Sequence, residues 1–108
     1  MMATERLSTH RDGQPRLQGA RCGDCCAVTF PVVDGCIVCG SAAQTIVDLS
    51  PLGRIESRTQ VGERIVCEIL LDGGPRVMGW LQARDSVEIG SSVRFAPCGH
   101  ELRFVPDV

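Results

Sequence analysis

The sequence predicts a mainly β chain of two modules, an N-terminal four-cysteine zinc ribbon and a small five-stranded antiparallel barrel. Three observations lead to this prediction. Two Cys-x-x-Cys pairs are separated by ten residues near the N-terminus. From residue 45 onward, short β-type runs alternate with turns rich in Gly, Pro and Asp, and no apolar repeat has helical spacing. We expect an arm over residues 1–20, the ribbon over 21–43 and the barrel over 44–108.

Composition sets the class of protein. The chain has 108 residues and a net charge of −2, and all 11 of its basic residues are arginine. The absence of lysine excludes Schiff-base chemistry on this chain, and the weakly acidic balance argues against general nucleic-acid binding, which depends on neutralising phosphates. We find neither an apolar run of about 18 residues nor a signal-peptide pattern, and expect no membrane association and a cytoplasmic location. In that reducing compartment, the seven cysteines indicate metal binding before disulfides.

The first 20 residues carry little periodic apolar signal. Gly13 and Pro15 interrupt any long helix. We expect an arm, with a short helical turn over 16–20, that is either disordered or ordered by a partner.

The four predicted metal ligands are Cys22, Cys25, Cys36 and Cys39. A Cys-x-x-Cys turn directs two thiolates at one ion, and two such turns supply the tetrahedral sulfur set that zinc favours. Four sulfurs close the coordination shell, so this zinc would be structural. The alternatives are two disulfides, buried free thiols, or iron in the same four-sulfur site.

Residues 27–33 and 34–35, between the two pairs, are predicted as a short strand and a turn. Cys26 directly follows Cys25 and competes with it as a ligand. The two-residue spacing of the second pair favours Cys25, which makes Cys26 a bystander.

The second module is predicted from its β-type runs. A hairpin turn is expected at 72–75, where the sequence is Asp-Gly-Gly-Pro. The expected strands cover residues 45–49, 54–61, 64–71, 76–81, 93–97 and 102–106. A small barrel of OB type accommodates such strands, because closure removes most sheet edges. Along 64–71, we expect one alternating set to fill the core and the other to be covered by a neighbour, with Cys67 as a small buried apolar residue.

The sequence gives little support for catalysis by this chain alone. The pair Cys98 and His100 reads as a turn rather than a catalytic dyad. Arg54, Arg58 and Arg76 are candidates for binding phosphate groups, although solvated strand charges explain them as well. Trp80 is the one plausible stacking residue for nucleic acid, and an interface or core anchor is the better interpretation.

With these pieces in this order, the chain resembles the DUF35 family, which combines a rubredoxin-like zinc ribbon with an OB-fold acyl-CoA-associated domain. The ribbon match is Cys22-x-x-Cys25, Phe30-Pro31 and Cys36-x-x-Cys39-Gly40. The barrel matches are residues 53–59 (GRIESRT), 72–79 (DGGPRVMG), 89–95 (IGSSVRF) and 102–106 (LRFVP). The chain departs from the family at Cys26, where Gly is usual, and in its short N-terminal segment.

The resemblance implies a non-catalytic accessory subunit of an acyl-CoA thiolase or aldolase-type complex. The thiolase-fold partner would carry the catalytic residues, and none is inherited by this chain. The resemblance also implies structural Zn²⁺, an acyl-CoA contacted in the complex, and a hetero-oligomer with two copies of each chain. The competing interpretation is a stand-alone zinc-ribbon and OB module that binds nucleic acid or protein.

Overall fold

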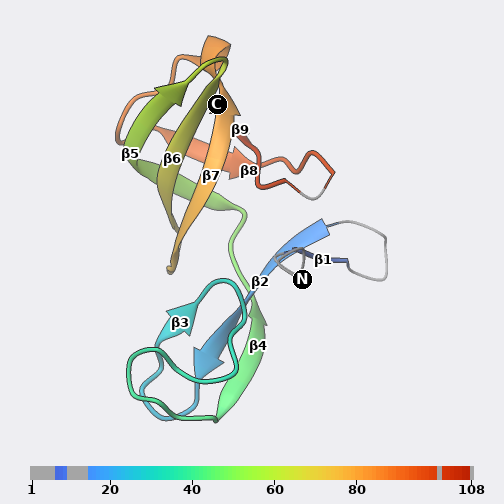
Figure 1. The fold of residues 1–108 in the computed structure, drawn as a ribbon, viewed down its shortest axis with the longest axis vertical. Helices are drawn as coiled ribbons and strands as arrows, with labels where there is room; N and C mark the ends of the chain where they lie inside the picture. The colour runs from blue at the N-terminus through green and yellow to red at the C-terminus, as the bar shows by residue number, and fades with distance from the viewer. Residues whose placement is uncertain (1–6, 10–14, 100, 108) are drawn as a thin grey trace. The chain divides into compact units, whose positions relative to one another are not determined.

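The computed structural model describes residues 7–9, 15–99 and 101–107, and divides the chain into two compact units after Leu49. Figure 1 shows the strands of both units. The described residues form strands and one short 3₁₀ turn, Ala83–Asp85 (η2), and contain no α-helix. The predicted mainly β class is confirmed. No helix in the described ranges is long and apolar enough to cross a membrane.

The first unit is built around β2 (Pro15–Cys22). This strand pairs antiparallel with β1 (Leu7–Thr9), β3 (Val28–Thr29) and β4 (Gln44–Asp48). At Gly19, an added Cβ would lie 2.3 Å from the carbonyl oxygen of Thr29, so only glycine permits this approach of β2 to its neighbour.

Two expectations for this unit are wrong. Residues 16–20 are strand rather than a helical turn, because they pair with β1, β3 and β4. The strand expected over 27–33 is confined to Val28–Thr29. The rest of the predicted arm, residues 1–6 and 10–14, lies outside the described residues.

The expected start of the barrel at residue 44 also differs from the structure. β4 pairs with β2 from Gln44 opposite Cys22 to Asp48 opposite Gln18, which places it in the first unit. A β-type run shows that a segment is a strand, but not which sheet receives it.

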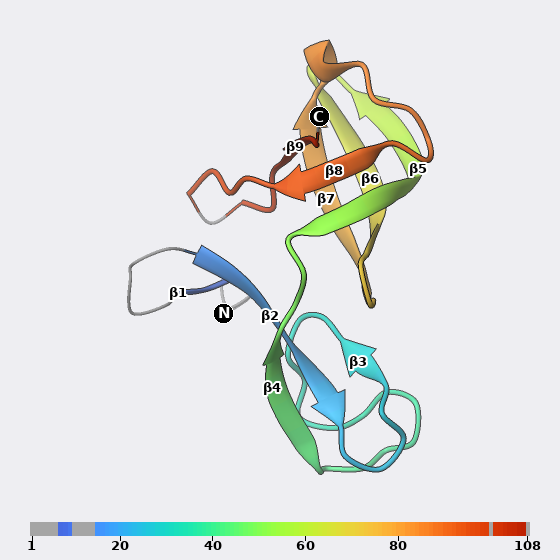
Figure 2. The ribbon, with the colours of Figure 1, turned by 180° about the vertical axis from the view of Figure 1, so that it is seen from behind.

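The second unit is a five-stranded sheet with the order β7-β6-β5-β8-β9. Its strands are β5 (Leu52–Val61), β6 (Arg64–Leu71), β7 (Arg76–Gln82), β8 (Ser92–Phe95) and β9 (Phe104–Pro106). β5 carries a register shift between Ile55 and Ser57 and pairs with both β6 and β8 (Figure 2). A parallel β-bridge joins Trp80 to Arg103 beside the start of β9. The backbone N–H of Trp80 donates to the carbonyl oxygen of Leu102 at 3.0 Å. This strand order fits the predicted OB-type barrel. The two end strands of the sheet, β7 and β9, meet at that β-bridge.

The interior of the barrel follows strict alternation along β6. Ile65, Cys67, Ile69 and Leu71 are buried, while the three residues between them are half-buried. The prediction that Cys67 is a buried core residue is confirmed. Phe104 is fully buried against Gly79, where an added Cβ would lie 2.6 Å from the ring. The predicted hairpin turn is also confirmed, with Gly73 and Gly74 at φ +82° and +76°.

Candidate metal centre

The two Cys-x-x-Cys pairs form two turns with the same backbone pattern. The N–H of Cys26 donates to the carbonyl oxygen of Cys22 at 3.0 Å, and the N–H of Gly40 donates to that of Cys36 at 2.8 Å. The residue that ends each turn is left-handed, with φ +66° at Cys26 and +80° at Gly40. β2 delivers Cys22 as its last residue, so the first turn is anchored to the sheet.

The turns bring the four predicted cysteines together. All four Sγ atoms lie within 4.8 Å of one another. The Sγ atoms of Cys22 and Cys39 are 3.5 Å apart, as are those of Cys25 and Cys36. A zinc ion with Zn–S bonds of about 2.3 Å would place sulfurs about 3.8 Å apart in a tetrahedron. The residues present therefore fit a four-sulfur metal site, and no pair among the seven cysteines forms a disulfide.

Backbone N–H groups point at two of the sulfurs. Those of Asp24 and Cys25 donate to the Sγ of Cys22 at 3.4 Å, and that of Val38 donates to the Sγ of Cys36 at 3.4 Å. Such bonds stabilise the thiolate form, which is the form that binds metal.

The pKa values within the cluster diverge. N–H groups of Cys25 and Asp24 lower the pKa of Cys22 to about 6, and those of Cys39 and Val38 lower the pKa of Cys36. The Ala27 N–H favours the thiolate of Cys25, but bonding to the Cys36 sulfur and burial outweigh it and raise the pKa of Cys25 to about 12. Four neighbouring thiolates repel one another, so a cation is needed for all four to be ionised together.

The two turns are also tied together outside the sulfur cluster. The N–H of Gly23 donates to the carbonyl oxygen of Ala43 at 2.6 Å, and the N–H of Cys36 donates to that of Ser41 at 2.8 Å. The hydroxyl of Ser41 donates to the carboxylate of Asp24. The sequence gives no sign of this bond, because nothing in the spacing of the cysteines relates Asp24 to Ser41.

The remaining cysteines lie outside the cluster. Cys26 and Cys98 are exposed, and Cys67 is buried in the barrel. The backbone of Cys98 forms an antiparallel β-bridge with Glu101, in keeping with the predicted turn. His100 lies outside the described residues.

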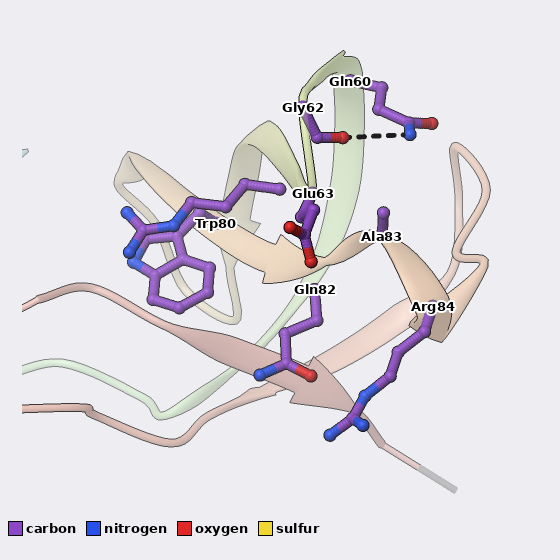
Figure 3. Close-up of a pocket in the computed structure, with 8 residues that line it drawn as sticks. Gln60, Gly62, Glu63, Trp80, Gln82, Ala83 and Arg84 are labelled. Carbon is purple, nitrogen blue, oxygen red and sulfur yellow. Dashed lines mark hydrogen bonds between the residues drawn. The ribbon is translucent and has the colours of Figure 1, made fainter.

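The barrel has a concave pocket of about 530 Å³ at the end of the β5–β6 hairpin, lined by residues that include Gln60, Trp80, Gln82 and Arg84. Figure 3 shows these side chains, with Gln60 donating to the carbonyl oxygen of Gly62 at 3.2 Å. The guanidinium of Arg64 lies 3.9 Å from the centroid of the Trp80 ring. Among the described residues that line it there is no cysteine, serine or histidine, and Glu63 is the one carboxylate.

The three arginines considered for phosphate groups do not form one cationic site. Arg54 and Arg76 line one hollow, where Arg76 bonds to Glu56 at 2.5 Å, and this bond raises the pKa of Arg76. Arg58 is opposite Cys67 in the ladder and thus on the interior face.

The aromatic residues do not offer a stacking surface for bases. Phe104 and Phe95 are buried in the barrel, with ring centroids 5.5 Å apart, and Phe30 is half-buried in the first unit. Trp80 is half-buried and covered by Arg64. Single-strand binders expose several such rings along a basic groove.

No protein-family model matches the chain, and no curated protein matches it. Among solved structures, a chain of the "Ltp2-ChsH2(DUF35) aldolase" matches with a TM-score of 0.68 and 25% sequence identity. The match covers 86% of this chain and 86% of that chain. The resemblance to DUF35 proteins, predicted from the order of the ribbon and barrel motifs, is therefore confirmed by a solved structure of both modules.

Proposed function

We propose that this chain is a non-catalytic, zinc-binding accessory subunit of an acyl-CoA thiolase or aldolase-type complex. The observation that carries the proposal is the match, over 86% of both chains, to a chain of a DUF35 aldolase. The four-cysteine cluster at the corresponding N-terminal module is consistent with it. The partner would be a thiolase-fold subunit, two copies of each chain would assemble, and the complex would act in the cytoplasm.

In this proposal Cys22, Cys25, Cys36 and Cys39 hold one Zn²⁺. Zinc bound by four thiolates has no open position for substrate, so it would supply cross-linking of the ribbon rather than catalysis. The ribbon's own residues hold both turns in place through the bonds of Gly23, Cys36 and Ser41 described above.

Carbon–carbon bond cleavage or formation at a CoA thioester would take place on the partner. This chain would act indirectly, by covering a face of the partner and ordering the surroundings of the acyl-CoA. The candidate catalytic pair of the sequence gives no support to a separate activity, since Cys98 is exposed and forms a turn with Glu101.

Co-expression with a thiolase-fold protein encoded in the same genome tests the proposal. The two chains should co-purify, and the complex should cleave 3-oxoacyl-CoA by thiolysis or 3-hydroxyacyl-CoA by retro-aldol reaction faster than the partner alone. Activity that is the same with and without this chain, in the absence of a stable complex, would refute the accessory role. Binding of single-stranded nucleic acid at physiological salt would favour the stand-alone module instead.

A further inference from the structure

The sulfur cluster has a buried side and an exposed side. Cys22 and Cys36, the first cysteine of each turn, are 0% and 5% exposed. Cys25 and Cys39, the second cysteine of each turn, are exposed. Cysteines buried in a protein interior are chemically inert, whereas accessible thiolates react with reagents in solution. Half of the proposed ligand set is therefore open to such reagents.

The exposed sulfurs also accept fewer hydrogen bonds than the buried ones. The Sγ atoms of Cys22 and Cys36 each accept from two backbone N–H groups of their own turn. Those of Cys25 and Cys39 each accept from one, which belongs to the residue two places further along the chain. A hydrogen bond draws charge from a thiolate and makes its sulfur less nucleophilic. Cys25 and Cys39 are therefore the more nucleophilic members as well as the more accessible ones.

Behind each exposed sulfur lies a buried sulfur of the other turn. The Sγ of Cys25 is 3.5 Å from that of Cys36, and the Sγ of Cys39 is 3.5 Å from that of Cys22. Cysteines that sense oxidants are accessible thiolates with a second cysteine close enough to form a disulfide. The cluster contains this arrangement twice, and both pairs join one turn to the other.

We propose that the exposed side of the cluster is a reversible oxidation site for hydroperoxides. Cys25 and Cys39 react first, and Cys36 and Cys22 then complete two disulfides between the turns. The inference rests on the proposed function in one respect, that the four cysteines hold zinc, because metal-bound cysteines are thiolates at neutral pH.

The reaction balances with hydrogen peroxide as the oxidant. The Cys25 thiolate attacks one peroxide oxygen, the O–O bond breaks, and a sulfenic acid and a hydroxide ion form. The Cys36 thiolate then attacks the sulfenic sulfur, the S–S bond forms, and the S–O bond breaks to release a second hydroxide ion. Two electrons pass from the two sulfurs to the peroxide, and both hydroxide ions take up protons from solvent. Because the two sulfurs are no longer thiolates, the site loses two of its four metal ligands.

The first test measures which sulfurs are reactive, using the full-length chain purified with one zinc ion bound. A substoichiometric amount of iodoacetamide at pH 7, followed by tandem mass spectrometry, gives the initial labelling rate of each cysteine. Cys25 and Cys39 should be labelled about 10-fold faster than Cys22 and Cys36. Equal labelling of all four would overturn the inference.

The second test follows the oxidation itself. About two equivalents of hydrogen peroxide per chain should release the zinc, which a chromogenic chelator detects. Peptide mapping after an acid quench should find the disulfides Cys25–Cys36 and Cys22–Cys39, and dithiothreitol with added Zn²⁺ should restore the metal content. Disulfides within each turn, or sulfinic acids that dithiothreitol does not reduce, would overturn the inference.

Two other cysteines of the chain provide controls. Cys98 is exposed but lies outside the cluster, so its oxidation with the zinc retained would show that exposure alone sets reactivity and would overturn the inference. Cys26 is exposed and follows Cys25 directly. Cys26→Ala should release zinc at the rate of the native chain, and a variant that resists peroxide would place the reaction on Cys26 instead.

Failure of the inference can be told apart from failure of the proposed function. A chain that holds zinc and resists peroxide overturns the oxidation site alone. A folded chain that binds no zinc removes the metal from the proposed function, and the oxidation site with it.

Discussion

Replacing Cys26 with glycine should stabilise the ribbon without changing its metal content. Cys26 is left-handed, at φ +66°, and occupies the same place in its turn as Gly40 does in the other. A residue with a Cβ pays about 1–2 kcal/mol for this conformation, whereas glycine adopts it freely. Glycine also gains about 0.5–1 kcal/mol of chain entropy in the unfolded state, which reduces the benefit. The expected net effect of Cys26→Gly is about 0.5–1 kcal/mol of added stability.

The measurement is thermal unfolding at a fixed free-zinc concentration, together with zinc stoichiometry. A gain of this size should raise Tm by about 2–8 °C. Cys26→Ala is the control: it removes the sulfur but keeps the strained backbone, so its Tm should stay close to that of the native chain. In the converse variant, Gly40→Ala, nothing lies within 4 Å of the new Cβ, so it should lose about 1–2 kcal/mol by backbone strain alone. Loss of zinc in Cys26→Gly, with Cys25→Ser still binding it, would show that Cys26 is the ligand and that our reading of this turn is wrong.

Three further outcomes are expected. Gly79→Ala should destabilise the barrel by about 1–3 kcal/mol in urea unfolding, because its Cβ would lie 2.6 Å from the buried ring of Phe104. Burial raises the pKa of Cys67, so its contribution to stability is full below pH 9, the ordinary thiol pKa, and is lost as pH rises above it. Between pH 8 and 10.5, urea midpoints should therefore fall further for the native chain than for Cys67→Ala. Zinc removal with a strong chelator should collapse the ribbon in heteronuclear NMR spectra while resonances of the barrel strands persist; loss of both sets together would contradict two separate cores.

The four-cysteine cluster was predictable because the spacing of the cysteines encodes it. Two Cys-x-x-Cys pairs can place four sulfurs within 4.8 Å whatever the intervening residues do. The barrel strands were predictable for a similar reason, since alternation along β6 and the glycines at 73 and 74 are local signals. The link between Asp24 and Ser41 was not predictable, because it depends on how the two turns face each other.

Strand pairing in the ribbon could not be read from the sequence either. β2 contains Gly19 and Pro15, which are poor strand formers, and its strand conformation comes from neighbours on both sides rather than from propensity. β4 has no buried residue at all, so its pattern gave no indication of which sheet it joins. Tertiary pairing therefore decided both segments, and it also moved the unit boundary to Leu49.

The distribution of buried side chains explains why the ribbon should depend on metal. Among the described residues of the first unit, the buried apolar side chains are Leu17, Ala20, Cys22 and Cys36. Two of these four are proposed ligands, which leaves one leucine and one alanine as the apolar core. Burial of so few groups contributes only about 2–4 kcal/mol, far less than the order of 10–16 kcal/mol available from zinc bound by such a peptide. Because Cys22 is both the last residue of β2 and a member of the sulfur cluster, the ion would fix the strand that organises the sheet. The metal would thus take the place in the ribbon that Phe104 and the β6 residues take in the barrel.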